Sequence, residues 1–118
     1  PVVVVATTDP VTRREARRVA EDLGFTVHEA ADGVEAVESA ARLRPVAMVL
    51  DRVLPRLQAE EVAERLQGQA ATRGVPLLVL AAGEDLGSRS ALFRECLPLP
   101  LERRALAAAL ERLGATVR

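Results

Sequence analysis

The sequence contains no lysine, tyrosine or tryptophan, only one cysteine, and no long apolar run. Its sixteen basic residues, all arginine, are balanced by seventeen acidic ones, which gives a formal net charge of −1. A chain so close to neutrality has no overall field that would attract nucleic acid or an anionic membrane. One cysteine cannot form an internal disulfide, and the apolar runs are far shorter than the roughly 20 residues that span a bilayer. These absences predict a cytoplasmic protein that binds neither nucleic acid nor membranes.

The composition is that of a globular chain with a substantial core. Of its 118 residues, 49% are hydrophobic and 28% are charged. This length is sufficient for one domain with a buried core but short for two. Residues 1–118 are therefore expected to form a single domain.

Segments of strand length alternate with segments of helical periodicity along the chain. The apolar segments predict five strands, at residues 2–6, 25–29, 46–50, 75–82 and 96–97. The amphipathic segments predict helices at residues 10–23, 34–43, 59–67 and 101–113, with room for only a short helix between 83 and 95. Strict alternation predicts an α/β fold with a parallel sheet and helices on both faces, because each crossover is right-handed and must cover the sheet.

The carboxyl ends of the strands are where such sheets collect reactive and ligand-binding groups. Five residues end or follow the predicted strands, although they lie far apart in sequence: Thr7, Thr8, Asp51, Ala81 and Leu99. We expect them to meet at one edge of the sheet. Asp51, which follows the apolar strand at 46–50, is the candidate reactive group.

Short motifs at these strand ends match those of a known family. They are Thr-Thr-Asp-Pro after the first strand, Ala-Asp-Gly after the second, Leu-Asp-Arg-Val-Leu-Pro around Asp51, and Leu-Pro-Leu-Pro at the fifth. In this order and at these spacings, the whole chain resembles the receiver domains of two-component response regulators. The resemblance implies a flavodoxin-like fold with strand order 2-1-3-4-5, and it places Asp51 at the phosphorylated position.

The resemblance also exposes departures at the positions that serve the reaction. Two adjacent acidic residues that help hold Mg²⁺ in the family are replaced by Thr7 and Thr8. The hydroxyl residue that ends the fourth strand is Ala81, and the lysine after the fifth strand is Leu99. The aromatic switch residue is Cys96, and the segment before it is shorter than usual, which implies a shortened fourth helix.

These departures remove most of what the reaction requires. Mg²⁺ prefers about six oxygen ligands, usually including one or two carboxylates. Thr7 and Thr8 offer only neutral hydroxyls, and Asp9, next to Pro10, is better placed to cap the first helix. Phosphoryl transfer depends on positioning and charge neutralisation, and losing one preorganised donor costs roughly 10² to 10³ in rate. The sequence therefore predicts no metal site, no other cofactor and severely impaired phosphorylation of Asp51.

Two functions remain open on these grounds. The first is an atypical receiver that acts as a protein-interaction or regulatory module without the phosphorylation cycle. The second is a receiver still phosphorylated on Asp51 by a histidine kinase or a phosphotransfer protein. An enzyme is not expected, because the sequence has neither a glycine-rich phosphate loop nor a nucleophile–base pair.

The expected partner is another protein, namely a kinase, a phosphotransfer protein or an output domain. A homodimer through the fifth strand and the last helix is the alternative. Such a surface would use apolar positions such as Leu97 or Leu101, or else the arginine-rich side of the first helix.

The candidate residues also have purely structural interpretations. Asp51 would then cap the end of its strand or pair with Arg52 or Arg56. The two threonines after the first strand would satisfy backbone groups. Cys96 is expected to be a buried apolar residue.

Overall fold

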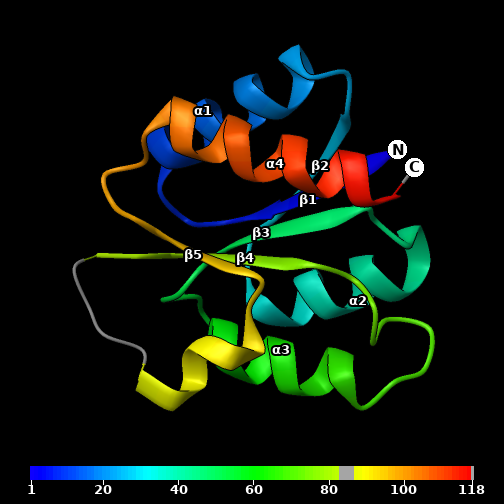
Figure 1. The fold of residues 1–118 in the computed structure, drawn as a ribbon. Coiled ribbons are helices and arrows are strands. Elements are labelled where there is room, and N and C mark those ends of the chain that lie inside the picture. The colour runs from blue at the N-terminus through cyan, green and yellow to red at the C-terminus, as the bar shows by residue number, and fades with distance from the viewer. Residues whose placement is uncertain (83–86, 118) are drawn as a thin grey trace.

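Five parallel strands form the middle layer of the protein, in the order β2-β1-β3-β4-β5 (Figure 1). The computed structural model describes residues 1–82 and 87–117. The strands are β1 (Val2–Ala6), β2 (Thr26–Ala30), β3 (Ala47–Asp51), β4 (Leu77–Ala81) and β5 (Glu95–Pro98). Each begins and ends within two residues of its predicted position, and the strand order is the one that the resemblance implies.

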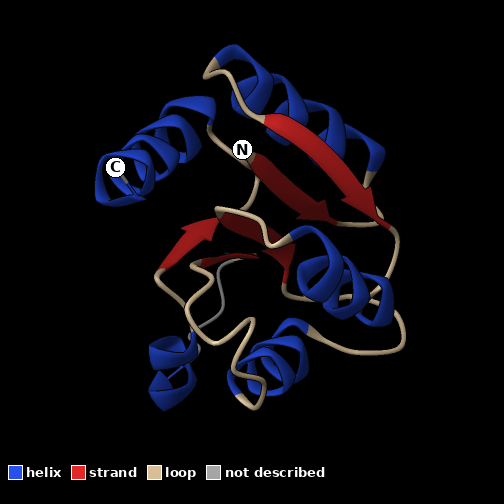
Figure 2. Ribbon diagram, turned by 90° about the vertical axis from the view of Figure 1, so that its right-hand side faces the viewer, coloured by secondary structure: helices blue, strands red, loops and turns tan. Residues whose placement is uncertain are grey.

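Helices cover both faces of this sheet (Figure 2). One face carries α1 (Pro10–Asp22) and α4 (Arg103–Val117), and the other carries α2 (Gly33–Leu43), α3 (Ala59–Gln67) and the 3-10 helix η1 (Gly87–Leu92). η1 is the short helix expected before β5, although residues 83–86 of that expected segment lie outside the described part of the chain. No helix in residues 1–82 and 87–117 is long and apolar enough to cross a membrane.

Alternation along the central strands builds a separate core on each face. Met48 and Leu50 belong to the core beneath α2 and α3, whereas Ala47 and Val49 belong to the core beneath α1 and α4. Burying a large aliphatic side chain contributes about 1.5–3 kcal/mol, so these two cores account for much of the stability. Because successive strand residues point to opposite faces, the same alternation directs Asp51 towards α1 and the next residue, Arg52, towards α3.

The start of α2 is fixed by a close approach to the loop between β3 and α3. Asp32 caps α2 by accepting a hydrogen bond from Glu35 N–H at 2.8 Å. Gly33 N–H donates to the Pro55 carbonyl at 3.1 Å, and a Cβ atom on Gly33 would lie 2.0 Å from the Leu57 carbonyl oxygen. A side chain at position 33 is therefore excluded by the neighbouring backbone.

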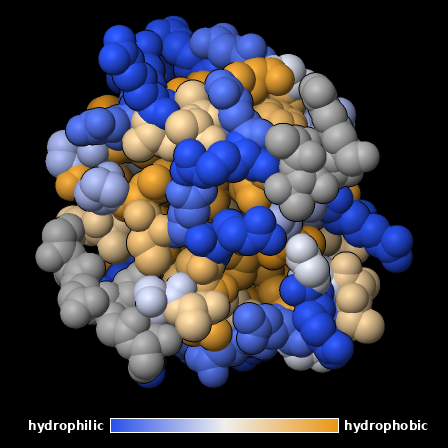
Figure 3. All heavy atoms as spheres, in the orientation of Figure 1, coloured by the Kyte–Doolittle hydropathy of each residue, from blue (hydrophilic) through white to orange (hydrophobic). Residues whose placement is uncertain are grey.

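Cys96 is exposed, so the expectation that it would be buried is wrong. Its neighbour Leu97 is only 8% exposed and lies in the core beneath α1 and α4, which places Cys96 on the opposite face of this edge strand. On that face η1 packs against α3. Hydrophobic residues also show between hydrophilic ones on the side of the molecule that faces the viewer in Figure 3. The burial of Leu97 also removes it from the expected partner surface.

Candidate functional site

The predicted edge residues meet at the carboxyl ends of the strands. Thr7 follows β1 and Asp51 ends β3, and the Thr7 hydroxyl donates a hydrogen bond to Asp51 Oδ2 at 3.0 Å. Ala81 ends β4, and its carbonyl accepts a hydrogen bond from Leu99 N–H at 3.2 Å. Because β3 pairs with β4, both contacts lie on the same edge of the sheet. Thr8 follows Thr7 and is exposed.

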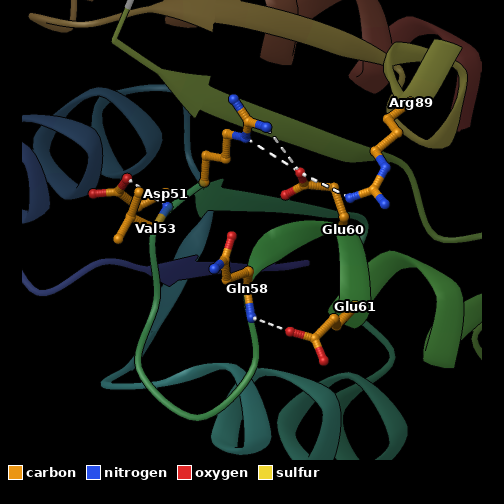
Figure 4. A network of polar contacts seen from close by, with 7 residues as sticks. Asp51, Val53, Gln58, Glu60, Glu61 and Arg89 are labelled. Carbon is orange, nitrogen blue, oxygen red and sulfur yellow. Dashed lines mark hydrogen bonds and ion pairs between the residues drawn. The ribbon is translucent and has the colours of Figure 1, made fainter. Parts of the chain in front are cut away.

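The Asp51 carboxylate is held by two neutral donors. The Thr7 hydroxyl contacts Oδ2. Val53 N–H donates to Oδ1 at 3.3 Å (Figure 4). The second bond forms an Asx-turn directly after β3. Asp51 therefore caps the end of its strand, which is one of the two structural roles expected for it.

The other expected role, an ion pair with a neighbouring arginine, is wrong. Arg52 Nη2 lies 3.1 Å from Glu60 Oε2, and Arg56 Nη1 lies 3.7 Å from Asp32 Oδ2. In the part of the chain that the structure describes, no arginine pairs with Asp51. Strand alternation explains this for Arg52, because consecutive side chains leave the strand on opposite faces.

Thr7 lies at this edge directly after β1, next to the end of β3. It is fully buried, and its Oγ1 atom both donates to Asp51 and accepts a hydrogen bond from Asp9 N–H at 3.1 Å. The hydroxyl therefore satisfies a backbone donor, as expected. Since a hydroxyl has a single proton, its donor capacity is used by Asp51.

Asp9 points to the helix that follows it. Its Oδ2 atom accepts hydrogen bonds from Thr12 Oγ1 at 2.6 Å and from Thr12 N–H at 3.2 Å, which confirms the expected cap of α1. The Thr12 hydroxyl and N–H hold the pKa of Asp9 below its ordinary value. Asp9 is thus a stably ionised capping residue.

The oxygen donors at this edge are the Asp51 carboxylate, the hydroxyls of Thr7 and Thr8, and the Asp9 carboxylate that caps α1. Asp51 supplies the carboxylate at the strand end, the adjacent side-chain oxygens of Thr7 and Thr8 are neutral, and Asp9 Oδ2 is occupied by Thr12. Within residues 1–82 and 87–117, no three His, Cys, Asp or Glu side chains are grouped so that they could hold a metal ion. Octahedral Mg²⁺ coordination usually takes one or two carboxylates together with waters and a phosphate oxygen.

A groove of about 380 Å³ lies beside this edge, between α1 and the segment that follows β5. Most of its lining is apolar, and Val11, one of the lining residues, is 56% exposed. The residues that line the groove are Asp9, Val11, Thr12, Glu15, Ala82, Leu99, Pro100 and Leu101. Leu101, expected as a partner-facing residue, is therefore accessible from outside.

A second carboxylate near this edge was not anticipated from the sequence. Glu60 lies in the first turn of α3 and is only 3% exposed, with Arg52 and Arg89 around it (Figure 4). An acidic residue in a first helical turn is common, because it interacts favourably with the helix dipole. The sequence therefore gave no indication that this one is buried.

Comparison with known proteins identifies the family. No family model matches the chain. The chain is 41% identical over 83 residues to the response regulator MprA of Mycobacterium leprae (strain TN), covering 70% of this chain and 36% of that protein. It is 39% identical over 89 residues to MprA of Mycobacterium ulcerans (strain Agy99), covering 75% and 38%. The chain thus spans little more than a third of the length of these curated relatives.

Solved structures match nearly the whole chain. The receiver domain of the sensor histidine kinase PA1611 from Pseudomonas aeruginosa PAO1, which has a magnesium ion coordinated in its active-site cleft, is 30% identical over 96% of this chain and 97% of its own, with a TM-score of 0.86. The receiver domain of the Francisella response regulator 1452 shares the fold at 20% identity, with a TM-score of 0.88 and coverage of 100% and 99%. Sheet order and helix placement define the flavodoxin-like class. Within that class, the chain belongs to the receiver domains of two-component response regulators.

Proposed function

We propose that this receiver domain acts as a protein-interaction and regulatory module that does not depend on phosphorylation of Asp51. The observation that carries the proposal is the hydrogen bond of 3.0 Å between the buried Thr7 hydroxyl and Asp51. Thr7 is neutral, and its single hydroxyl proton is donated to Asp51. In the family, a carboxylate at this position helps to hold a cation. The proposal includes the absence of Mg²⁺ binding and of enzymatic activity.

The aliphatic residues at the same edge support this proposal. Ala81 and Leu99 end β4 and follow β5, and neither carries a polar side-chain group. A phosphoryl group on Asp51 would bring additional negative charge, which phosphoryl-transfer sites neutralise with cations and hydrogen-bond donors. The described side chains at this edge offer no cation that contacts Asp51.

The apolar groove beside α1 is the proposed partner surface. It combines the exposed Val11 with Leu99 and Leu101, so a partner would bury apolar area there. We propose that the partner is a protein, namely a kinase, a phosphotransfer protein, an output domain or a second copy of this chain. Nucleic acid and membranes are not proposed partners, and the proposed location is the cytoplasm.

The test is an intact-mass measurement after incubation with a small acyl phosphate and Mg²⁺. We expect no gain of a phosphoryl group by the wild type. The matched positive control is the variant Thr7→Asp/Thr8→Asp/Ala81→Thr/Leu99→Lys, which rebuilds the donors and charges that the family uses and is expected to gain the group. A phosphorylated wild type, with the gain abolished in Asp51→Asn, would contradict the proposal.

The alternative function is a receiver that is still phosphorylated on Asp51 by a histidine kinase or a phosphotransfer protein. The position of Asp51 supports it, because the carboxylate ends β3 and is only partly buried. A protein donor could supply catalytic groups that a small phosphodonor lacks. Repeating the mass measurement with a panel of phosphorylated phosphotransfer proteins distinguishes the two functions, since only the alternative predicts a modified Asp51.

A further inference from the structure

Glu60 is a buried carboxylate that joins three separate segments of the chain. Its Oε2 atom accepts a hydrogen bond from Arg52 Nε at 3.2 Å and lies 3.1 Å from Arg52 Nη2. The same oxygen lies 3.7 Å from Arg89 Nη1 (Figure 4). Arg52 follows β3, Glu60 begins α3 and Arg89 belongs to η1, so the cluster connects the strand end to both helices.

The two arginines differ in how they are held. The side chain of Arg52 is 20% exposed and approaches Glu60 with two nitrogen atoms, whereas that of Arg89 is 65% exposed and approaches with one. Removing a buried carboxylate from water costs several kcal/mol unless charges or hydrogen bonds compensate for it. Since Glu60 Oε1 is buried without a hydrogen-bond partner, the compensation comes through Oε2 and the two guanidiniums.

η1 needs such a contact because its apolar anchors are at one end. Leu92 and Phe93 pack on the core beneath α2 and α3, and Phe93 is 7% exposed. Ser90 and Ala91, closer to the start of the helix, are exposed. The pairing of Arg89 with Glu60 therefore fixes η1 at a second point, away from Leu92 and Phe93.

The cluster is also separated from Asp51, although Arg52 is the next residue. Asp51 contacts Thr7 on the α1 side of the sheet, while Arg52 contacts Glu60 on the α3 side. This separation follows from the alternation of side chains along β3 and its extension. In the described part of the chain, Asp51 and the Arg52 guanidinium therefore have different partners, Thr7 and Glu60, one on each side of the sheet.

We propose that Arg52, Glu60 and Arg89 form an electrostatic clamp, here called the Glu60 clamp, that fixes η1 on α3 whatever the charge of Asp51. This independence from Asp51 rests on the proposed function. The clamp adds a physical reason for it, because η1 is held to α3 through Glu60. It predicts that η1 is released when the clamp is broken and is unaffected when Asp51 is neutralised.

Amide hydrogen exchange of η1 and Phe93, whose N–H donates to the Ser90 carbonyl at 3.1 Å, tests this proposal. Glu60→Gln should accelerate exchange of these amides by about tenfold or more, because it removes the charge that both arginines contact. Arg89→Gln alters only an exposed partner, so it should keep the fold and accelerate exchange about threefold. Arg65→Gln, at an exposed position of α3, is the matched control and should leave exchange unchanged. Amides of β4 report global unfolding and serve as the internal reference.

The outcomes separate the clamp from the proposed function. The clamp would be overturned if the η1 amides of Glu60→Gln and Arg89→Gln exchanged at the same rate as those of Arg65→Gln while the β4 amides stayed protected. Asp51→Asn is the second arm and should behave as the wild type. Faster exchange of η1 in Asp51→Asn alone would contradict a function that is independent of Asp51. The clamp would still be tested separately by Glu60→Gln and Arg89→Gln.

Discussion

Two carboxylates on opposite sides of one strand end have contrasting environments. Asp51, on the α1 side, accepts hydrogen bonds from a hydroxyl and a backbone N–H. Glu60, on the α3 side, is almost fully buried and contacts two guanidiniums. The family places its chemistry at the first position, yet in this chain the charge compensation lies at the second. The segment after β3 contacts α2 through the Pro55 carbonyl and α3 through the pairing of Arg52 with Glu60, which also pairs with Arg89 of η1.

The largest expected effect tests the tight packing on the α2–α3 side. Gly33→Ala would place a Cβ atom 2.0 Å from the Leu57 carbonyl oxygen, so α2 or the loop must move. Overpacking against backbone is expected to lower the free energy of unfolding by about 3 kcal/mol. Urea denaturation measures this loss. Gly24→Ala is a useful contrast, because the Cβ has open space there and the cost comes only from the φ of +94°.

The second prediction compares the two carboxylates directly. Glu60→Ala removes the carboxylate that Arg52 and Arg89 share. We expect the free energy of unfolding to fall by about 2 kcal/mol, which is less than for a fully buried pair because both arginines remain partly exposed to solvent. Asp51→Asn keeps the shape and acceptor at the strand end and is expected to change stability by less than about 0.5 kcal/mol. Equal losses in denaturant titrations of the two variants would remove the contrast on which the comparison rests.

A smaller, stabilising effect is expected in the loop between the two carboxylates. Arg56 has a φ of 69°, a left-handed conformation that disfavours side chains, and its side chain, which lies 3.7 Å from Asp32, is 65% exposed. Arg56→Gly should therefore raise the free energy of unfolding by roughly 0.5–1 kcal/mol. Arg42→Gly, within α2, is the control and should lower it by about the same amount. A destabilised Arg56→Gly would show that the ion pair outweighs the backbone strain.

The smallest effect concerns pH and the Asp9 cap. Hydrogen bonds from Thr12 lower the pKa of Asp9 below its ordinary 3.8, so ionised Asp9 stabilises the folded state above that pH. This contribution is lost as the pH falls through the lowered folded-state pKa. Asp9→Asn retains a capping acceptor but does not titrate at this position. The stability advantage of the wild type over Asp9→Asn should be constant between about pH 5 and 8 and should shrink below about pH 4.

The sequence was informative where the physical signal is local. Apolar strands and the Asp9 cap were sufficient for the parallel sheet, the start of α1 and the meeting of Thr7 with Asp51, whereas the strand order came from the family resemblance. The failures concern contacts between distant segments. The exposure of Cys96 depends on what packs on the face of β5 opposite Leu97, and the pairing of Arg52 depends on the strand face from which it leaves. The proposed Glu60 clamp joins residues from three separate segments of the chain, and no local pattern marks it.

The most direct test of the account is the response of amide chemical shifts to the charge at position 51. Spectra of wild type, Asp51→Asn and Asp51→Glu should differ only near Thr7, Val53 and residue 51 itself, because these groups share the affected hydrogen bonds. Shifts over η1, β5 and α4 should coincide in all three proteins. Large changes that propagate through η1 and along residues 95–113 would show that a switch survives, and would contradict a module whose surface is independent of Asp51.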